Sequence, residues 1–288
     1  MTFCILTETP KNIQNVVDKQ GAIILRQTEI DTVDKFSDFV HILGEPNVDM
    51  SCSAGPRLDV ASNVFTSNEA PSNEQIPPHH EMAQCEDPPS YIVFYCLVPP
   101  LSGGCTPIIR SIDVAKQFKT WYPSLYERLK KEGVRYLREL PSVTEYTQPL
   151  GKSWKETYHV KNHTELETKL NEKNISWKWL DNDVIQTIGP ILPIFRKDNN
   201  GEESFFMAAE TSFVNTNLVS KKMLLHGNGD YFDNQTAAAF HHIGKYAFTQ
   251  STRIPWCEHD ILIINNSTVM HSRDSFTGPR KIVVSLIK

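Results

Sequence analysis

The sequence predicts one domain of mixed α+β class, mainly β, spanning residues 1–288. Its expected core is a double-stranded β-helix (jelly-roll, cupin-like) with helices in front of it and a central insert at about 145–215. Many short runs of β-branched and aromatic residues are separated by turns rich in Pro, Gly and Asn. Helical periodicity is confined to a few segments, and no internal repeat or clean linker divides the chain.

The N-terminal segment predicts a helix, a strand and a second helix. Apolar residues at helical spacing indicate a helix over 12–19, which Gly21 ends. Residues 22–25 are apolar and short enough for a buried strand. We expect Asp31 to cap a further helix that continues to about Leu43.

Residues 45–75 are rich in Pro, Ser, Asn and Gly and predict a long loop with one strand around 58–65. Long loops in compact domains tend to be binding elements. Residues 91–98 are an unbroken apolar run whose β-branched and aromatic content favours a fully buried strand. The pair Pro99-Pro100 ends that strand.

After this strand, residues 102–104 predict a turn and 106–109 a second strand. Residues 112–132 have apolar positions at helical spacing and predict one helix, with Gly133 as its stop.

The second half of the chain returns to strands. Residues 134–210 alternate short strands with polar loops, and a capping-box pattern predicts one helix beginning at Thr164. A further helix is expected from Asp233 to about Phe248. Residues 260–264 and 280–287 predict the two last strands.

The net charge of -5, without a block of Lys or Arg, argues against nucleic-acid binding. No run reaches about 18 apolar residues, so we expect no membrane span, and the N-terminus lacks the features of a signal peptide. The six cysteines lack CxxC spacing and predict free thiols, which favours the cytoplasm. The oligomeric state cannot be predicted from these features.

A His-x-Glu pair at His79 and Glu81 lies just before the apolar run of 91–98. In an extended segment, side chains two residues apart lie on the same face, so both can bind one ion. Two histidines and one carboxylate on one face of an octahedral ion suit non-haem Fe(II) oxygenases. The local pattern leaves a loop histidine beside a surface glutamate as an equal alternative. A second such pair, His163 and Glu165, falls at a predicted helix start, where its side chains would diverge.

His271 is the best candidate for the third ligand, because it follows a buried strand that ends in polar turn residues. His241 and His242 fall in a predicted helix, His226 lies beside a glycine-rich loop, and His259 precedes a strand.

Several motifs occur in the order found in one enzyme family. They are Ile76-Pro-Pro-His-His-Glu-Met-Ala-Gln84, residues 89–96, Ser102-Gly-Gly-Cys-Thr-Pro-Ile108, Gly151-Lys-Ser-Trp-Lys155, residues 256–265 and Val269-Met-His-Ser-Arg-Asp-Ser-Phe276 with Arg280 and Lys281. With them the chain resembles the Fe(II)/2-oxoglutarate-dependent dioxygenases of the taurine dioxygenase superfamily (TauD/TfdA), in particular the clavaminate-synthase-like branch. The resemblance covers about residues 50–288 and favours metal binding by the His-x-Glu pair of His79 and Glu81.

The resemblance implies Fe(II), 2-oxoglutarate and O2 as cofactors. It assigns His79, Glu81 and His271 to the metal and Thr106 to a carboxylate of 2-oxoglutarate. The other carboxylate of 2-oxoglutarate would meet Arg280 or, as some members align, Lys281, since only one of two neighbouring strand residues faces inward. His80 is expected not to bind the metal itself, but to support the metal ligands or to belong to a lid.

The resemblance further implies oxidation of a C–H bond of a small, amino-acid-like or carboxylate-bearing metabolite, with release of succinate and CO2. Glu81 argues against halogenation, and Val284-Ser285 replaces a second arginine that sulfonate-binding members carry. The 45–75 loop and the insert would cover the mouth of the site. Candidate partners for a substrate carboxylate are Arg57, Lys152, Arg196 and Arg273.

The type of oxidation stays open between hydroxylation, desaturation and oxidative cyclisation. One alternative is a kainoid-type cyclase that acts on an N-prenylated glutamate. Two others are a peptide or protein hydroxylase and a catalytically silent binding member of the family.

Overall fold

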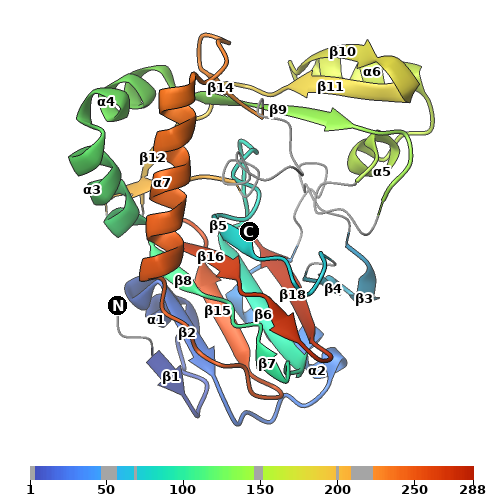
Figure 1. Cartoon of the computed structure of the whole chain (residues 1–288). Coiled ribbons are helices and arrows are strands. Elements are labelled where there is room, and N and C mark those ends of the chain that lie inside the picture. The colour runs from blue at the N-terminus through green and yellow to red at the C-terminus, as the bar shows by residue number, and fades with distance from the viewer. Residues whose placement is uncertain (1–3, 47–56, 68–69, 146–151, 199–200, 209–222) are drawn as a thin grey trace.

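The computed structural model describes residues 4–46, 57–67, 70–145, 152–198, 201–208 and 223–288. It has a mixed α+β fold with two stacked sheets in its lower part, and helices together with a further sheet above them (Figure 1). None of the helices in these ranges is long and apolar enough to cross a membrane.

The strands are β1 (Cys4–Leu6), β2 (Ala22–Leu25), β3 (Asp59–Ala61), β4 (Val64–Thr66), β5 (Ile76–His79), β6 (Tyr91–Val98), β7 (Ser102–Gly103), β8 (Ile108–Arg110), β9 (Val134–Leu140), β10 (Ser176–Leu180), β11 (Val184–Ile188), β12 (Phe195–Lys197), β13 (Glu203–Phe205), β14 (Leu224–His226), β15 (Ile261–Asn265), β16 (Val269–Arg273), β17 (Phe276–Thr277) and β18 (Lys281–Ile287). The helices are α1 (Ile13–Gln20), α2 (Val33–Val40), α3 (Ser111–Trp121), α4 (Pro123–Glu132), α5 (Trp154–Tyr158), α6 (His163–Glu172) and α7 (Asn234–Gln250), with 3-10 turns at His41–Leu43 and Asp181–Asp183.

A seven-stranded sheet in the order β1-β2-β15-β6-β18-β4-β3 forms the base of the molecule. Its central strand β6 is the unbroken apolar run, and its side chains alternate between two cores. Tyr91, Val93 and Tyr95 pack with α1 and α2, whereas Ile92 and Phe94 face the opposite side. Because both faces of β6 are covered, a slip of one residue would exchange the two sets of side chains, so its register is strongly specified.

The small sheet β5-β16-β8 packs on the second face of the large sheet. Ile108 of β8 and Val269 of β16 share a core with Phe94 and Leu262 of the large sheet. This sheet carries both candidate histidine ligands, so the packing of two sheets positions the site.

A third layer covers the far side of the small sheet (Figure 1). Phe118 of α3, Phe240 of α7 and Phe205 of β13 form its core. A four-stranded sheet, β10-β11-β9-β14, extends from this layer and carries α5 and α6. It takes β9 and β14 from outside the predicted insert of 145–215, and residues 146–151, 199–200 and 209–222 of this region lie outside the described residues.

Four local predictions are wrong in their details. The helix predicted over 112–132 is two helices, because Pro123 disfavours helical geometry at Tyr122, where φ is -133° and ψ is 57°. The cap of α2 is Thr32, whose hydroxyl accepts a hydrogen bond from the Lys35 backbone N–H, and not Asp31. The strand predicted over 58–65 is the hairpin β3–β4, in which Asn63 has a positive φ of 57°.

The capping box of α6 begins at Asn162 and not at Thr164. The Asn162 side chain accepts a hydrogen bond from the Glu165 N–H, and the Glu165 carboxylate accepts one from the Lys161 N–H. Of the predicted loop 45–75, residues 47–56 and 68–69 lie outside the described residues.

Candidate metal centre

His79 and His271 are direct partners across the antiparallel pair β5–β16. Residues opposite each other in such a pair project to the same face, and here the two imidazole ring centroids are 4.2 Å apart. The Phe94 ring of the large sheet lies 5.4 Å from the His271 ring. The two histidines therefore face the space between the sheets from neighbouring strands.

Glu81 completes a cluster of three, two residues after His79. One ligand atom from each of His79, Glu81 and His271 lies within 4.8 Å of the other two. Within the described part of the chain, no other group of three His, Cys, Asp or Glu side chains comes this close. The structure thus brings together the three side chains that the sequence analysis selected.

The protonation of the two histidines suits a metal ligand. Burial lowers the pKa of His79 and lowers that of His271 well below its ordinary value, so both rings are neutral near pH 7. The Pro77 carbonyl accepts a hydrogen bond of 2.8 Å from His79 Nδ1, which leaves the Nε2 lone pair for an ion. Nδ1 of His271 is buried and has no hydrogen-bond partner in the described ranges. Two neutral imidazoles and one carboxylate fit Fe(II).

Two neighbours hold Glu81. The Arg57 guanidinium lies 2.8 Å from Glu81 Oε2 through its Nη2 atom, and both side chains are nearly buried. The side chain of Asn266 forms hydrogen bonds with the Glu81 N–H at 2.9 Å and the Glu81 carbonyl at 3.0 Å. From the sequence, Arg57 was expected to contact the substrate. Asn266 was not predicted, because its only local signal is a turn after a strand.

His80 is buried and points to the opposite side from the two ligands. Its Nδ1 accepts a hydrogen bond from the Met207 N–H at 3.3 Å, so Nε2 carries the proton and donates to Ser111 Oγ at 2.6 Å. Its ring stacks on Phe206 with centroids 4.2 Å apart. His80 therefore links the strand of the site to α3 and to the segment after β13.

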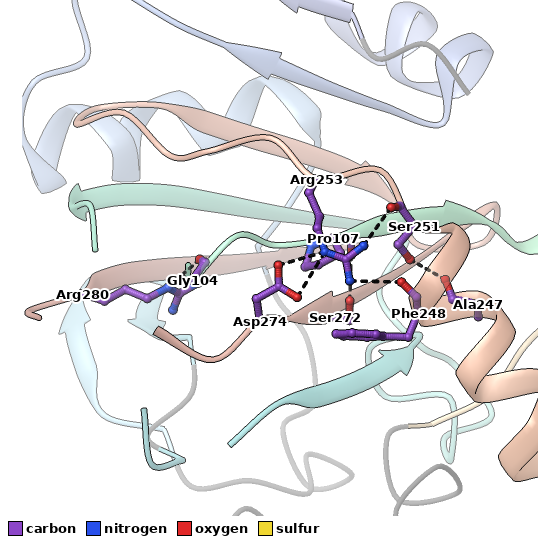
Figure 2. Close-up of polar contacts among 9 residues, drawn as sticks. All are labelled: Gly104, Pro107, Ala247, Phe248, Ser251, Arg253, Ser272, Asp274 and Arg280. Carbon is purple, nitrogen blue, oxygen red and sulfur yellow. Dashed lines mark hydrogen bonds and ion pairs between the residues drawn. The ribbon is translucent and has the colours of Figure 1, made fainter. Parts of the chain in front are cut away.

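The candidates for 2-oxoglutarate binding lie at the end of β18 and beside β8. Thr106 is buried at the edge of the small sheet, and Arg280 donates a 3.0 Å hydrogen bond from Nε to the Gly104 carbonyl (Figure 2). Burial and the nearby Arg273 lower the pKa of Arg280 to about 10, so it stays charged near pH 7. Lys281 is exposed to solvent.

A polar network behind the His271 strand was not predicted. Figure 2 shows Arg253 between Asp274, which follows β16, and the end of α7. Its Nε lies 3.1 Å from Asp274 Oδ2, and its Nη atoms donate to the carbonyls of Ser251 and Phe248. This network ties α7 to the strand that carries His271.

The remaining predicted substrate partners have different surroundings. Arg273 donates three hydrogen bonds to the carbonyls of residues 70, 71 and 74, so it holds that loop. Arg196 stacks on the Phe206 ring at 4.1 Å, and burial lowers its pKa. Lys152 is buried.

The other histidines lie outside the cluster. His163 pairs with Asp183 at 2.7 Å on the surface, and His242 stacks on Trp121 with centroids 4.2 Å apart. His226 is buried, and its Nδ1 lies 3.7 Å from Glu132 Oε2.

A facial cluster of two histidines and one carboxylate on stacked sheets is typical of the mononuclear non-haem iron proteins. The model of the family described as taurine catabolism dioxygenase TauD, TfdA family matches residues 4–286, so the chain belongs to this family. Enzymes of this family use Fe(II), 2-oxoglutarate and O2 and act on small molecules, and this protein is an enzyme of that type. The family, enzyme class and cofactors expected from the sequence are confirmed.

A clavaminate synthase-like protein from Arabidopsis thaliana is 30% identical over 296 residues, covering 100% of this chain and 89% of the relative. The dapdiamide synthesis protein DdaC from Enterobacter agglomerans is 26% identical over 289 residues, covering 96% and 84%. The crystal structure of AAD-2 in complex with Mn(II) and N-oxalylglycine has a TM-score of 0.56 at 11% identity, covering 98% of this chain and 88% of that one. This last similarity shows a shared fold.

Proposed function

We propose that the enzyme oxidises a C–H bond of a small, amino-acid-like or carboxylate-bearing metabolite, with release of succinate and CO2. The observation that supports this most directly is the approach of one ligand atom from each of His79, Glu81 and His271 to within 4.8 Å. Similarity to a protein of dapdiamide synthesis favours a substrate from specialised amino-acid metabolism.

In this proposal His79, Glu81 and His271 hold Fe(II), which activates O2 once 2-oxoglutarate is bound. The protein keeps both imidazoles neutral by burial and fixes the His79 tautomer through Pro77. The seven-stranded and three-stranded sheets would be the two walls of the jelly roll expected from the sequence, and the core they share supports this.

Thr106 and Arg280 would bind 2-oxoglutarate. A guanidinium pairs with a carboxylate through two charge-assisted hydrogen bonds, and within the described part of the chain Arg280 donates a hydrogen bond through its Nε, to Gly104. We favour Arg280 over Lys281, because Lys281 is exposed whereas Arg280 is partly buried.

Arg57 is the best supported partner for a substrate carboxylate among the candidates Arg57, Lys152, Arg196 and Arg273. Its Nη1 atom is buried beside the cluster and has no hydrogen-bond partner among the described residues, and an acceptor on a bound ligand would satisfy it. The predicted insert and the 45–75 loop would close the mouth over this substrate. We also propose a cytoplasmic location, which the free thiols of Cys4, Cys85, Cys96, Cys105 and Cys257 support.

The test replaces each ligand with alanine: His79→Ala, Glu81→Ala and His271→Ala. Each should abolish succinate formation and weaken Mn(II) binding at the site. His163→Ala is the matched control, because His163 belongs to the other His-x-Glu pair and faces Asp183. Wild-type turnover in any one of the three variants would disprove the proposed cluster.

A metabolite screen with the Fe(II) and 2-oxoglutarate complex would find the substrate. Product mass then separates the outcomes, since hydroxylation adds an oxygen atom, whereas desaturation and ring closure remove two hydrogens. Binding of metal and 2-oxoglutarate without turnover of any substrate would instead support a catalytically silent member.

A further inference from the structure

The ion pair between Arg57 and Glu81 lies at the metal centre itself. Arg57 Nη2 is 2.8 Å from Glu81 Oε2, and the two side chains are 11% and 10% exposed. Most exposed ion pairs stabilise a protein little, but this one is withdrawn from water and its carboxylate is a candidate ligand. The side chain of Asn266 also forms hydrogen bonds with the backbone N–H and carbonyl of Glu81, so the Cα position from which this carboxylate extends is fixed.

We propose that Arg57 is a positioning residue of the metal centre that holds Oε2 of Glu81, so that only Oε1 of this carboxylate is offered to the ion. This inference rests on the proposed function, because it takes His79, Glu81 and His271 as the ligands. It gives Arg57 a role on the protein side of the ion, in addition to any contact with substrate through Nη1.

The number of oxygens that Glu81 supplies determines how many positions stay open on the ion. With two imidazoles and one carboxylate oxygen, an octahedral ion keeps about three positions for exogenous ligands. A glutamate that bound through both oxygens would fill one of them. The chelating co-substrate needs two, and O2 needs one more. A guanidinium that holds Oε2 would therefore keep one more position of a bound ion open.

The geometry of arginine suits this role better than that of lysine. The planar guanidinium can hold Glu81 through Nη2 while Nη1 points elsewhere. A lysine would supply one mobile ammonium group and no fixed direction.

A competing interpretation is that Arg57 and the metal ion compete for the negative charge of Glu81. The two interpretations predict opposite changes in metal affinity when Arg57 is replaced. If Arg57 competes with the ion, its removal should tighten metal binding. If Arg57 positions Glu81, its removal should weaken metal binding, because loss of residues that orient metal ligands typically costs about 10–100-fold in affinity.

The experiment uses Mn(II) as the probe with the full-length wild-type protein, Arg57→Gln and Arg57→Lys. The control Arg128→Gln breaks an Arg–carboxylate pair with Glu132 on α4, where Arg128 Nε lies 3.1 Å from Glu132 Oε2. Titration measures Mn(II) affinity, and broadening of the Mn(II) EPR signal by ¹⁷O-water counts the water ligands. Loss of a merely structural contact would not change that water count.

We expect wild type and Arg128→Gln to keep about three water ligands. Arg57→Gln should bind Mn(II) about 10–100-fold more weakly and lose one water. Arg57→Lys should recover part of the affinity, and it decides the question if Arg57→Gln does not fold. An unchanged water count in the folded Arg57 variants, or tighter Mn(II) binding, would overturn the inference. Failure of wild type to bind Mn(II) through His79 would instead refute the proposed function.

Discussion

The side chain of Asn266 forms hydrogen bonds with both the backbone N–H and the backbone carbonyl of Glu81. Its Oδ1 accepts a hydrogen bond from the Glu81 N–H at 2.9 Å, and its Nδ2 donates to the Glu81 carbonyl at 3.0 Å and to the Pro89 carbonyl at 2.9 Å. Asn266 lies in the turn between β15 and β16, and His271 lies in β16. One short segment therefore supplies one candidate ligand and fixes the backbone of another.

Replacing Asn266 with alanine should destabilise the protein. The side chain is fully buried, and its loss leaves the Glu81 N–H and two carbonyls without their partner. Net losses near 1 kcal/mol for each hydrogen bond predict a fall of about 2–4 kcal/mol in the free energy of unfolding. Urea unfolding of the metal-free protein measures this fall, and metal affinity should drop as well.

Asn228→Ala is the matched control, because the Asn228 side chain is exposed and contacts only Asp230 within the same turn. An Asn266→Ala protein as stable as this control would show that the Asn266 hydrogen bonds contribute nothing to folding.

The sequence predicts the elements whose determinants are local. The bounds of β6 match because an eight-residue apolar run is followed by two prolines, and α1 ends at Gly21, whose φ is 82°. The pairing of His79 with Glu81 follows from the period of an extended chain. These features need no information from distant residues.

The features that could not be predicted depend on the pairing of strands that lie far apart in the sequence. His79 and His271 become neighbours only through the pairing of β5 with β16. Arg57 reaches the candidate metal ligand Glu81 through the packing of the chain around the β3–β4 hairpin. That packing cannot be seen in the sequence, from which Arg57 was expected to contact the substrate. The local errors arose where neighbouring residues compete to cap a helix, as Asp31 and Thr32 do, and where a single residue such as Pro123 or Asn63 interrupts an element.

The cap of α2 gives a direct test of such an error. Thr32→Ala should lower the free energy of unfolding by about 1 kcal/mol, because the Lys35 N–H loses the hydroxyl that caps it. Asp31→Ala should cost less, since Asp31 forms only an exposed ion pair with Lys35. Urea unfolding of both variants measures the two losses. A larger loss in the free energy of unfolding for Asp31→Ala than for Thr32→Ala would support Asp31 as the cap, as predicted from the sequence.

His226 should make the protein less stable in acid. Burial and Arg128 lower its pKa below the ordinary value, while Glu132, Asp233 and Asp230 oppose this shift. The unfolded chain therefore binds a proton more readily than the folded protein once the pH falls below about 6.5. The contribution of this group to stability is complete above that pH and is lost as the pH decreases further, by at most about 1.4 kcal/mol per pH unit.

His226→Gln should remove this part of the pH dependence. Urea unfolding at pH values from about 7 to 5 should give a shallower slope for the variant than for wild type. His242→Gln serves as the control, because His242 is exposed on α7. Parallel slopes for wild type and His226→Gln would show that His226 takes up its proton equally in both states.

The choice between Arg280 and Lys281 can be settled by binding of 2-oxoglutarate. Neighbouring residues of a strand face opposite sides, and the structure has Lys281 in solvent and Arg280 partly buried against Gly104 and Phe276. Loss of a charge-assisted hydrogen-bonded pair costs about 1.5–3 kcal/mol, so Arg280→Gln should weaken 2-oxoglutarate binding by about 10–150-fold. Lys281→Gln should leave it unchanged.

Anaerobic titration of the Mn(II)-loaded protein with 2-oxoglutarate measures this affinity. Arg280→Lys should recover only part of it, because an ammonium group cannot form the bidentate pair. Thermal unfolding of each variant separates a binding defect from the loss of the hydrogen bond to Gly104. If Lys281→Gln weakens binding and Arg280→Gln does not, the co-substrate approaches β18 from the other face and our assignment of Arg280 is wrong.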